Sequence, residues 1–252
     1  MSLEALIFDV DGTLADTERD GHRLAFNRAF AEAGLDWEWS ETVYGELLAV
    51  TGGKERIRHY VANYRPDFDV PADFDEQVAA LHAAKTRFYT EMMQRAEIPF
   101  RPGVMRLLEE ARGAGLRLAI ATTTTPANVT ALLGSSGIPD MESWFEVIGA
   151  GDVVPKKKPA PDIYEYVLEK MKLVPEACVA FEDSENGIKS SRGAGLRTVV
   201  TINDYTRDHE FDGALIVLDS LGEPENPFKV LTETPVNGYQ FFNLSLLKSL
   251  ID

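Results

Sequence analysis

The sequence predicts an α/β protein, a Rossmann-like parallel sheet with helices on both faces and an inserted α-helical cap. Three observations carry this prediction. Short apolar runs alternate with segments of helical period, and a long stretch without strands interrupts this alternation. In addition, acidic or polar residues follow several of the apolar runs directly.

The expected strands are apolar along their whole length, which is typical of strands buried on both faces of a parallel sheet. They cover residues 3–8, 116–121, 145–149, 178–181 and 198–202. Helices are expected between them, at residues 104–114, 127–136, 162–171 and 185–193. Prolines near the starts of these helices and glycines near their ends, such as Pro126 and Gly137, support the boundaries.

Between residues 16 and 100 the pattern is helical, with helices expected at 20–33, 41–50, 54–63 and 73–95. We therefore predict a core formed by residues 1–15 and 101–252 and a cap formed by residues 16–100. Ligands of such sheets bind beyond the carboxyl ends of the strands, so a cap inserted there would close over the site and exclude water. After Leu218 we expect an irregular segment that ends in a short helix over 242–250.

The composition limits the classes of partner. The chain has 41 acidic and 25 basic residues and a formal net charge of −16, which repels nucleic acid. An anionic substrate would therefore need local positive charge at its site. The single cysteine, Cys178, favours a reducing compartment, and we find neither a signal-peptide pattern nor a membrane-spanning run. We expect a cytoplasmic monomer with no nucleic-acid or membrane partner.

Two aspartates follow the first expected strand in the run from Asp9 to Thr13. Asp9 and Asp11 are two residues apart in an extended chain, so their side chains point to the same side. Gly12 permits a sharp turn, and Thr13 offers a hydroxyl and a backbone N–H group. An ordinary Asx turn at a strand end is the alternative. Two carboxylates this close need a cation between them or a proton on one of them.

Other strand ends supply matching groups. Glu182 and Asp183 follow the strand at 178–181, although Ser184 beside them could simply cap the next helix. Oxygen ligands without nearby His or Cys favour Mg²⁺ over zinc. Thr122 follows the strand at 116–121, and Lys158 lies in a lysine run that would otherwise be a solvated surface. We expect these groups to meet at one site that binds a phosphate.

The expected cap contains basic residues that could hold a second phosphate. Lys85 lies on an apolar helical stripe, where it either extends to solvent from the margin or points into the cleft. Residues 51–56 place a glycine pair before a helix that bears Lys54 and Arg56, a pattern that can bind an anion or be a solvated helix start. We therefore expect a bisphosphate, or a sugar phosphate bound at both ends.

Taken in order, these motifs resemble those of the haloacid dehalogenase-like hydrolase superfamily, with the cap position of its subfamily I. The resemblance implies that Asp9 attacks phosphorus to form an aspartyl-phosphate, while Asp11 acts as general acid and then general base. It also implies that Thr122 and Lys158 stabilise the transferring phosphoryl group. Asp9, the Asp11 carbonyl and Asp183 would hold Mg²⁺, with support from Glu182.

More closely, the chain resembles the CbbY group, which is similar to β-phosphoglucomutases and includes xylulose-1,5-bisphosphate phosphatases. Residues 37–39, 51–56, 82–86 and 158–164 carry this similarity. One departure is that Glu18 and His22 are four residues apart, where the group has a spacing of three. The residues expected to contact a small phosphorylated substrate are Thr13, Glu18, His22, Gly53, Lys54, Arg56, Lys85 and Thr123.

Three functions remain open from the sequence. A phosphatase passes the phosphoryl group to water, whereas a phosphomutase with the same intermediate returns it to a sugar hydroxyl. A non-catalytic binding protein on the same scaffold is the third, although binding alone would not require Asp11. The presence of Asp11 also argues against the dehalogenase branch of the superfamily.

Overall fold

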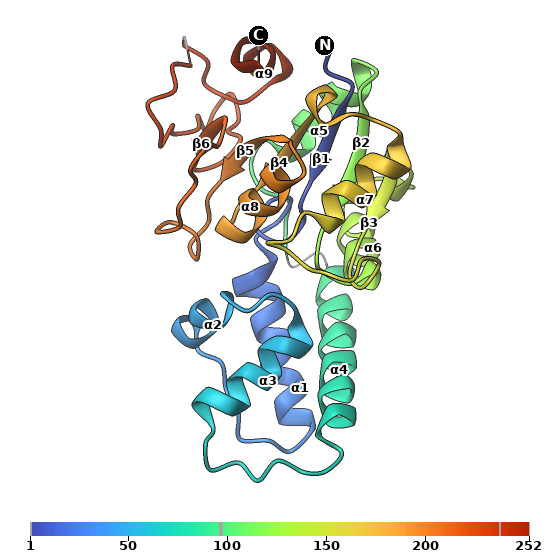
Figure 1. The fold of residues 1–252 in the computed structure, drawn as a ribbon, viewed down its shortest axis with the longest axis vertical. Coiled ribbons are helices and arrows are strands. Elements are labelled where there is room, and N and C mark those ends of the chain that lie inside the picture. The colour runs from blue at the N-terminus through green and yellow to red at the C-terminus, as the bar shows by residue number, and fades with distance from the viewer. Residues whose placement is uncertain (1, 96–97, 237, 252) are drawn as a thin grey trace.

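A computed structural model describes residues 2–95, 98–236 and 238–251 of the chain. Its centre is a six-stranded parallel sheet with strand order β3-β2-β1-β4-β5-β6 (Figure 1). The strands are β1 (Ala5–Phe8), β2 (Arg117–Ala121), β3 (Phe145–Gly149), β4 (Cys178–Glu182), β5 (Arg197–Thr201) and β6 (Ile216–Leu218). The predicted fold class is therefore confirmed.

Helices cover both faces of the sheet because successive strand side chains point in opposite directions. Leu6 and Phe8 of β1 pack with helices α5 (Val104–Gly113), α6 (Pro126–Gly134) and α9 (Leu244–Ile251). Ala5 and Ile7 point to the other face, where α7 (Asp162–Met171) packs. Helix α8 (Glu185–Gly193) covers β5 and β6 on that second face. All four residues of β1 are fully buried, so the carboxyl end of β1 is held at the middle of the sheet.

The segment between β1 and α5 is helical and lies beyond the carboxyl ends of the strands (Figure 1). It contains η1 (Glu18–His22), α1 (Arg23–Glu32), α2 (Glu41–Leu47), α3 (Gly53–Tyr64) and α4 (Phe74–Gln94). It has an apolar cluster of its own, in which Phe26, Phe30, Trp37 and Trp39 pack ring against ring. We keep the division into a core of residues 1–15 and 101–252 and a cap of residues 16–100 as a proposal.

Several predicted boundaries differ from the structure. The strand expected from residue 3 begins at Ala5, and the helix expected at 20–33 begins as a π-helix at Glu18. The helix expected at 41–50 ends at Leu47. β6 was not predicted, because three residues are too few for a periodic signal and this strand forms by pairing with β5. Within the described ranges, no helix is both long and apolar enough to cross a membrane.

Candidate active site

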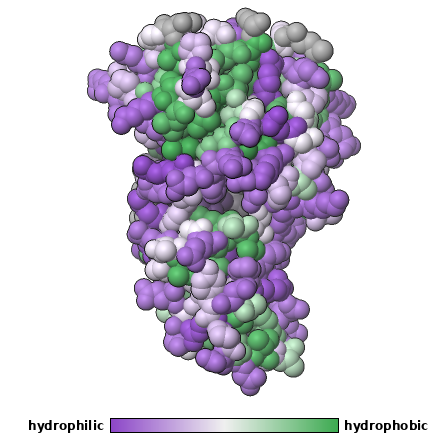
Figure 2. Space-filling model, turned by 60° about the vertical axis from the view of Figure 1, so that its left-hand side comes forward, coloured by the Kyte–Doolittle hydropathy of each residue, from purple (hydrophilic) through white to green (hydrophobic). Residues whose placement is uncertain are grey.

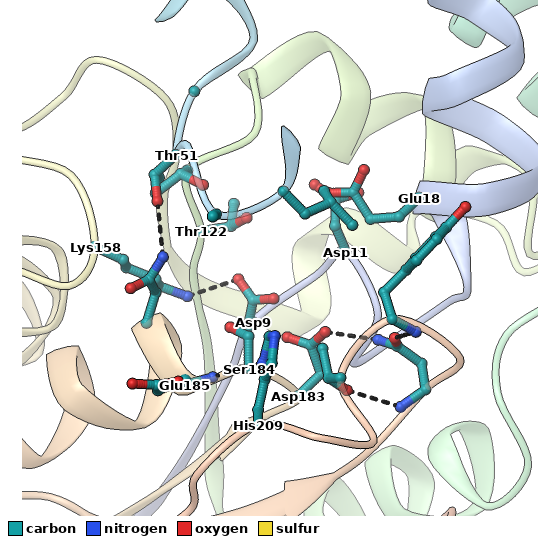
Figure 3. Close-up of a pocket in the computed structure, with 18 of the residues that line it drawn as sticks. Asp9, Asp11, Glu18, Thr51, Thr122, Lys158, Asp183, Ser184, Glu185 and His209 are labelled. Atoms are coloured by element: carbon teal, nitrogen blue, oxygen red, sulfur yellow. Dashed lines mark hydrogen bonds and ion pairs between the residues drawn. The ribbon is translucent and has the colours of Figure 1, made fainter. Parts of the chain in front are cut away.

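The carboxyl ends of β1, β2 and β4 open into a cavity of about 340 Å³ between the sheet and the cap (Figure 3). Five residues predicted from strand ends and the lysine run line it: Asp9, Asp11, Thr122, Lys158 and Asp183. On the face of the molecule in Figure 2, a band of hydrophilic residues crosses between the sheet-containing part and the helical part. This boundary therefore suits a polar ligand.

The turn after β1 depends on Gly12. Its φ of 86° lies in the left-handed region that favours glycine. A Cβ atom at this position would overlap the carboxylate of Asp183 and the amide of Asn203. Gly12 therefore brings the β1 loop against the end of β4, and Arg101 holds this loop by donating to the Gly12 carbonyl.

Lys158 forms ion pairs with two buried carboxylates. Its Nζ atom lies 2.7 Å from Oδ1 of Asp9 and 2.6 Å from Oε1 of Glu182. The Tyr164 hydroxyl donates to the same Glu182 oxygen, and a side chain at Gly187 would overlap Glu182. Burial raises the pKa of Asp9 to about 7, although Lys158 opposes this shift. Burial alone would lower the pKa of Lys158, but Asp9 and Glu182 together raise it above its ordinary value.

The donor set fits a hard divalent cation. Carboxylate oxygens of Asp9, Glu182 and Asp183 lie within 4.8 Å of one another, and all three residues are buried. Burial, followed by the charges of Asp9 and Glu182, raises the pKa of Asp183 well above its ordinary value. Asn203 fixes the orientation of Asp183 by donating from Nδ2 to Oδ2 over 2.7 Å. Three ionised carboxylates beside the single ammonium of Lys158 would carry an excess of negative charge, which Mg²⁺ would balance.

The Asp11 carboxylate points away from this cluster, towards the cap. It accepts hydrogen bonds from Thr17 and from Nε2 of His22, the latter over 2.8 Å. Nζ of Lys85 lies 2.8 Å from Nδ1 of His22. Because an ammonium can only donate, Nδ1 accepts and Nε2 carries the proton that is donated to Asp11. Burial would raise the pKa of Asp11, but His22 and Thr17 together lower it below its ordinary value.

The four-residue spacing between Glu18 and His22 is accommodated by η1. This element is a π-helix, and the N–H group of Arg23 donates to the carbonyl of Glu18, five residues earlier. A π-turn holds one residue more than an α-turn, so the spacing does not move His22 out of the site. The structure therefore places His22 against Asp11 despite the departure from the CbbY pattern.

A second cavity, of about 430 Å³, adjoins the first and reaches the start of α6. Asp11, Glu18, Gly52, Arg56 and Thr123 line both cavities. The second is also lined by Gly53, His22, Lys54, Lys85, His82, Asp152 and Lys157. Ion pairs cross between cap and core at its edge, with Lys54 Nζ 3.5 Å from Asp152 and Lys157 Nζ 3.5 Å from Glu55.

Four of the predicted site residues do not extend freely into a cavity. The Thr13 hydroxyl is buried, lines neither cavity and has no hydrogen-bond partner among the described residues. Glu182 is buried behind Lys158 and lines neither cavity. Lys85 and Arg56 are buried and bonded to other side chains, rather than extended into open space.

The structure also shows site residues that sequence reasoning missed. These are Thr17, Tyr44, Lys157, Tyr164 and Asn203. Asn203 could have been found, because it follows the strand predicted at 198–202 just as Thr122 and Asp183 follow theirs. Tyr44 and Tyr164 carry no such signal, since buried tyrosines at helical spacing usually serve as core residues.

Comparisons with known proteins show which family the chain is similar to. A family model described as haloacid dehalogenase-like hydrolase matches residues 3–195. The plasmid form of protein CbbY from Cupriavidus necator is 46% identical over 247 residues, which are 98% of this chain and 96% of that protein. The crystal structure of CbbY from Rhodobacter sphaeroides in complex with phosphate has a TM-score of 0.80 at 48% identity, covering 86% of this chain and 94% of that one. A mutant of that protein, in complex with xylulose-(1,5)bisphosphate, has a TM-score of 0.80 at 47% identity and the same coverage.

Proposed function

The chain belongs to the haloacid dehalogenase-like hydrolase family and is a phosphatase, and we propose that it hydrolyses a sugar bisphosphate through a phosphorylated Asp9. The observation that carries this proposal is the convergence of Asp9, Asp11, Thr122 and Lys158 on one cavity from three segments of the chain. A site that only bound phosphate would not need a buried carboxylate facing the phosphorus, because two negative groups repel each other.

Each of these side chains has a separate task. An oxygen of Asp9 attacks phosphorus, the bond from phosphorus to the substrate oxygen breaks, and Asp11 gives that oxygen a proton. Water then loses a proton to Asp11 and attacks the same phosphorus, so that the bond to Asp9 breaks and inorganic phosphate leaves. Lys158 and Thr122 stabilise the charge on the phosphoryl oxygens during both steps.

Asp11 must gain a proton before it can act as an acid. With Thr17 and His22 donating to it, the lowered pKa keeps this carboxyl ionised when the cavity holds no substrate. An anionic phosphoryl group nearby raises the pKa of a carboxyl group. Substrate binding therefore favours the protonated Asp11 that the first step requires.

We propose that Mg²⁺ is held by Asp9, Asp183 and the Asp11 carbonyl, with Glu182 orienting the site from behind. When bound, this ion would offset the negative charge of the phosphoryl group and of the carboxylates around it. The crowding of three buried carboxylates supports the assignment. The Asp11 side chain, by contrast, remains available for proton transfer.

The second cavity supports a substrate with two phosphates. One phosphate would lie against Asp9 and Lys158, and the other in the cavity lined by Lys54 and Lys157. The chain carries a net charge of −16, so this local group of cations matters for any anionic ligand. The Rhodobacter sphaeroides relative whose structure holds xylulose-(1,5)bisphosphate makes that compound the first to test.

The test is phosphate release in Mg²⁺ from a panel of phosphorylated compounds: xylulose 1,5-bisphosphate, fructose 1,6-bisphosphate, β-glucose 1-phosphate and phosphoglycolate. We expect the highest kcat/KM with a sugar bisphosphate, and loss of turnover in Asp9→Asn. Mass spectrometry of enzyme quenched in acid should show one added phosphoryl group in the wild type, and none in Asp9→Asn.

The same panel separates the alternatives. Isomerised sugar phosphate without free phosphate would favour a phosphomutase. Equal kcat/KM for mono- and bisphosphates would contradict the bisphosphate assignment, while turnover that persists in Asp9→Asn would contradict the aspartyl-phosphate.

A further inference from the structure

The loop of residues 202–206 follows β5 and lies beside the metal cluster. Its first residue is held at the sheet, because the Ile202 N–H group donates to the Leu218 carbonyl over 2.9 Å. The loop then closes into a tight turn. The Thr206 N–H group donates to the Asn203 carbonyl over 3.2 Å, and the Asn203 N–H group donates to the Thr206 hydroxyl over 3.0 Å. A turn closed in this way transmits a displacement at one residue to the others.

The Asn203 amide is held by hydrogen bonds on both sides. Its Nδ2 atom donates to Oδ2 of Asp183 over 2.7 Å, and its Oδ1 atom accepts from the N–H group of Tyr205 over 2.9 Å. Rotating the amide by half a turn would break both hydrogen bonds, because the amide nitrogen only donates and the amide oxygen only accepts. The backbone position of Tyr205 therefore fixes the Asn203 side chain, and the Asn203 side chain fixes the Asp183 carboxylate.

The Tyr205 side chain extends from this loop to the cap. Its ring packs against the apolar cluster of the cap and lies edge-to-face on Tyr44, with 6.0 Å between the ring centroids. Gly45 of α2 makes room for the ring, because a Cβ atom there would lie 3.1 Å from Cδ1 of Tyr205. The Tyr205 hydroxyl is buried and has no hydrogen-bond partner among the described residues. The ring therefore anchors the loop on the cap by packing.

We infer that Tyr205 is a positioning residue of the metal site, which acts through Asn203 on Asp183 and makes the orientation of that carboxylate depend on the cap. This inference rests on the proposed function, because it assumes the proposed Mg²⁺ site. The three carboxylates of the metal cluster all lie outside the cap. Hydrogen bonds that orient a metal ligand have a strong effect on metal affinity. Mg²⁺ should therefore bind most tightly when the cap lies against residues 202–206.

The test measures Mg²⁺ binding in the absence of substrate. Calorimetry, and the rise in melting temperature with Mg²⁺ concentration, give the Kd of the metal-free enzyme for Mg²⁺. We expect Asn203→Ala to raise this Kd about tenfold, the usual loss when a residue that orients a metal ligand is removed. Tyr205→Ala should raise it about fivefold, because the loop loses its anchor on the cap. Tyr205→Phe should keep the wild-type Kd, since the missing hydroxyl has no partner.

Three further variants separate positioning from a general loss of packing. Adding Tyr205→Ala to Asn203→Ala should change the Kd for Mg²⁺ by less than about twofold, because both residues act through the same hydrogen bond to Asp183. Gly45→Val changes only the cap, and it should raise the Kd as Tyr205→Ala does, because it displaces the Tyr205 ring. Tyr64→Ala is the matched control. It removes a ring that stacks on Tyr60 elsewhere in the cap, and it should leave the Kd unchanged.

Melting of the metal-free variants reports on folding, and Tyr205→Leu takes the place of Tyr205→Ala if that variant does not fold. An unchanged Kd for Mg²⁺ in folded Tyr205→Ala or Gly45→Val would overturn the inference, as would independent effects of Tyr205→Ala and Asn203→Ala. A raised KM for a sugar bisphosphate with an unchanged Kd for Mg²⁺ would instead make Tyr205 a substrate contact in the first cavity, which it lines. Failure of the proposed function is a separate result, because the wild type would then neither bind Mg²⁺ nor release phosphate.

Discussion

Nζ of Lys158 lies 2.7 Å from Oδ1 of Asp9, and both side chains are buried at the centre of the site. The same ammonium lies 2.6 Å from Glu182, so one positive charge serves two carboxylates. Lys158 lowers the pKa of Asp9 against the effect of burial, which raises it. The lysine therefore supports the nucleophile in two ways, since it favours the ionised carboxylate and offsets charge on the phosphoryl group.

Replacing Lys158 should show both effects. We expect Lys158→Met to lower kcat/KM by about 10² to 10³-fold, the usual loss when a group that stabilises transition-state charge is removed. The acid limb of the pH profile should also move to higher pH, because Asp9 would lose the charge that favours its ionised form. Steady-state kinetics across the pH range measure both.

Lys156→Met is the control for this variant, because Lys156 is exposed in the same lysine run and lines neither cavity. It should keep the wild-type profile. A Lys158→Met enzyme with low activity but an unmoved acid limb would contradict the assigned influence on Asp9.

The pH dependence of kcat/KM should change with the concentration of Mg²⁺. Asp9 must be ionised to attack, and its pKa is raised to about 7 by burial when no metal is bound. At low Mg²⁺, kcat/KM should therefore rise with pH through about 7. A cation and a proton compete for the same carboxylates, so more Mg²⁺ should move this limb to lower pH. Profiles at two Mg²⁺ concentrations check this. An acid limb at the same pH for both would count against Asp9 as a ligand.

The sequence predicted the part of the site that depends on strand ends. Asp9, Thr122 and Asp183 each follow a buried parallel strand, and the topology of such sheets brings those ends together. Lys158 was predicted from its charge and its place in the motif order. For these residues, the sequence motifs and the topology of the sheet predict the same position in the site.

The contacts within the cap were harder to predict. The spacing of apolar residues shows which face of a helix is buried, but it does not show which side chain from another helix lies against that face. Lys85 was expected in the cleft or at the margin of the stripe, whereas its partner, His22, lies 63 positions away on another helix. For Arg56, the decisive partner is Tyr44, whose position depends on how α2 packs on α3. The π-helix at Glu18 is also set by tertiary contacts, since a Cβ atom at Gly21 would crowd Ile98 and Tyr89.

Removing one carboxylate from the metal cluster should stabilise the protein when no metal is present. Burial raises the pKa of Asp183 well above its ordinary value, so the folded state binds its proton more tightly than the unfolded state does. Stability from this group is present at low pH and is lost as pH rises towards the raised pKa. In EDTA, Asp183→Asn should therefore melt a few degrees higher than the wild type at about pH 8, by roughly 2–4 °C per kcal/mol.

Mg²⁺ provides the complement to that experiment. It should raise the melting temperature of the wild type, and more at about pH 8 than at about pH 6, because protons compete at the lower pH. Asp183→Asn should lose most of this shift. Asp152→Asn is the control, because Asp152 is an exposed carboxylate outside the metal cluster. If Asp183→Asn kept the full Mg²⁺ shift, Asp183 would not be a ligand.

The second phosphate can be tested through Lys157, which lines only the second of the two large cavities. Its ammonium lies 3.3 Å from Asp152 and 3.5 Å from Glu55, so it also helps to hold the cap against the core. Comparing two substrates separates these roles, because weaker cap closure lowers kcat/KM for mono- and bisphosphates alike. We expect Lys157→Met to raise KM for a sugar bisphosphate about fivefold more than for the matching monophosphate, a modest effect because the side chain is partly exposed. Lys156→Met should not alter the ratio of the two KM values. Equal changes for both substrates in Lys157→Met would place the second phosphate elsewhere.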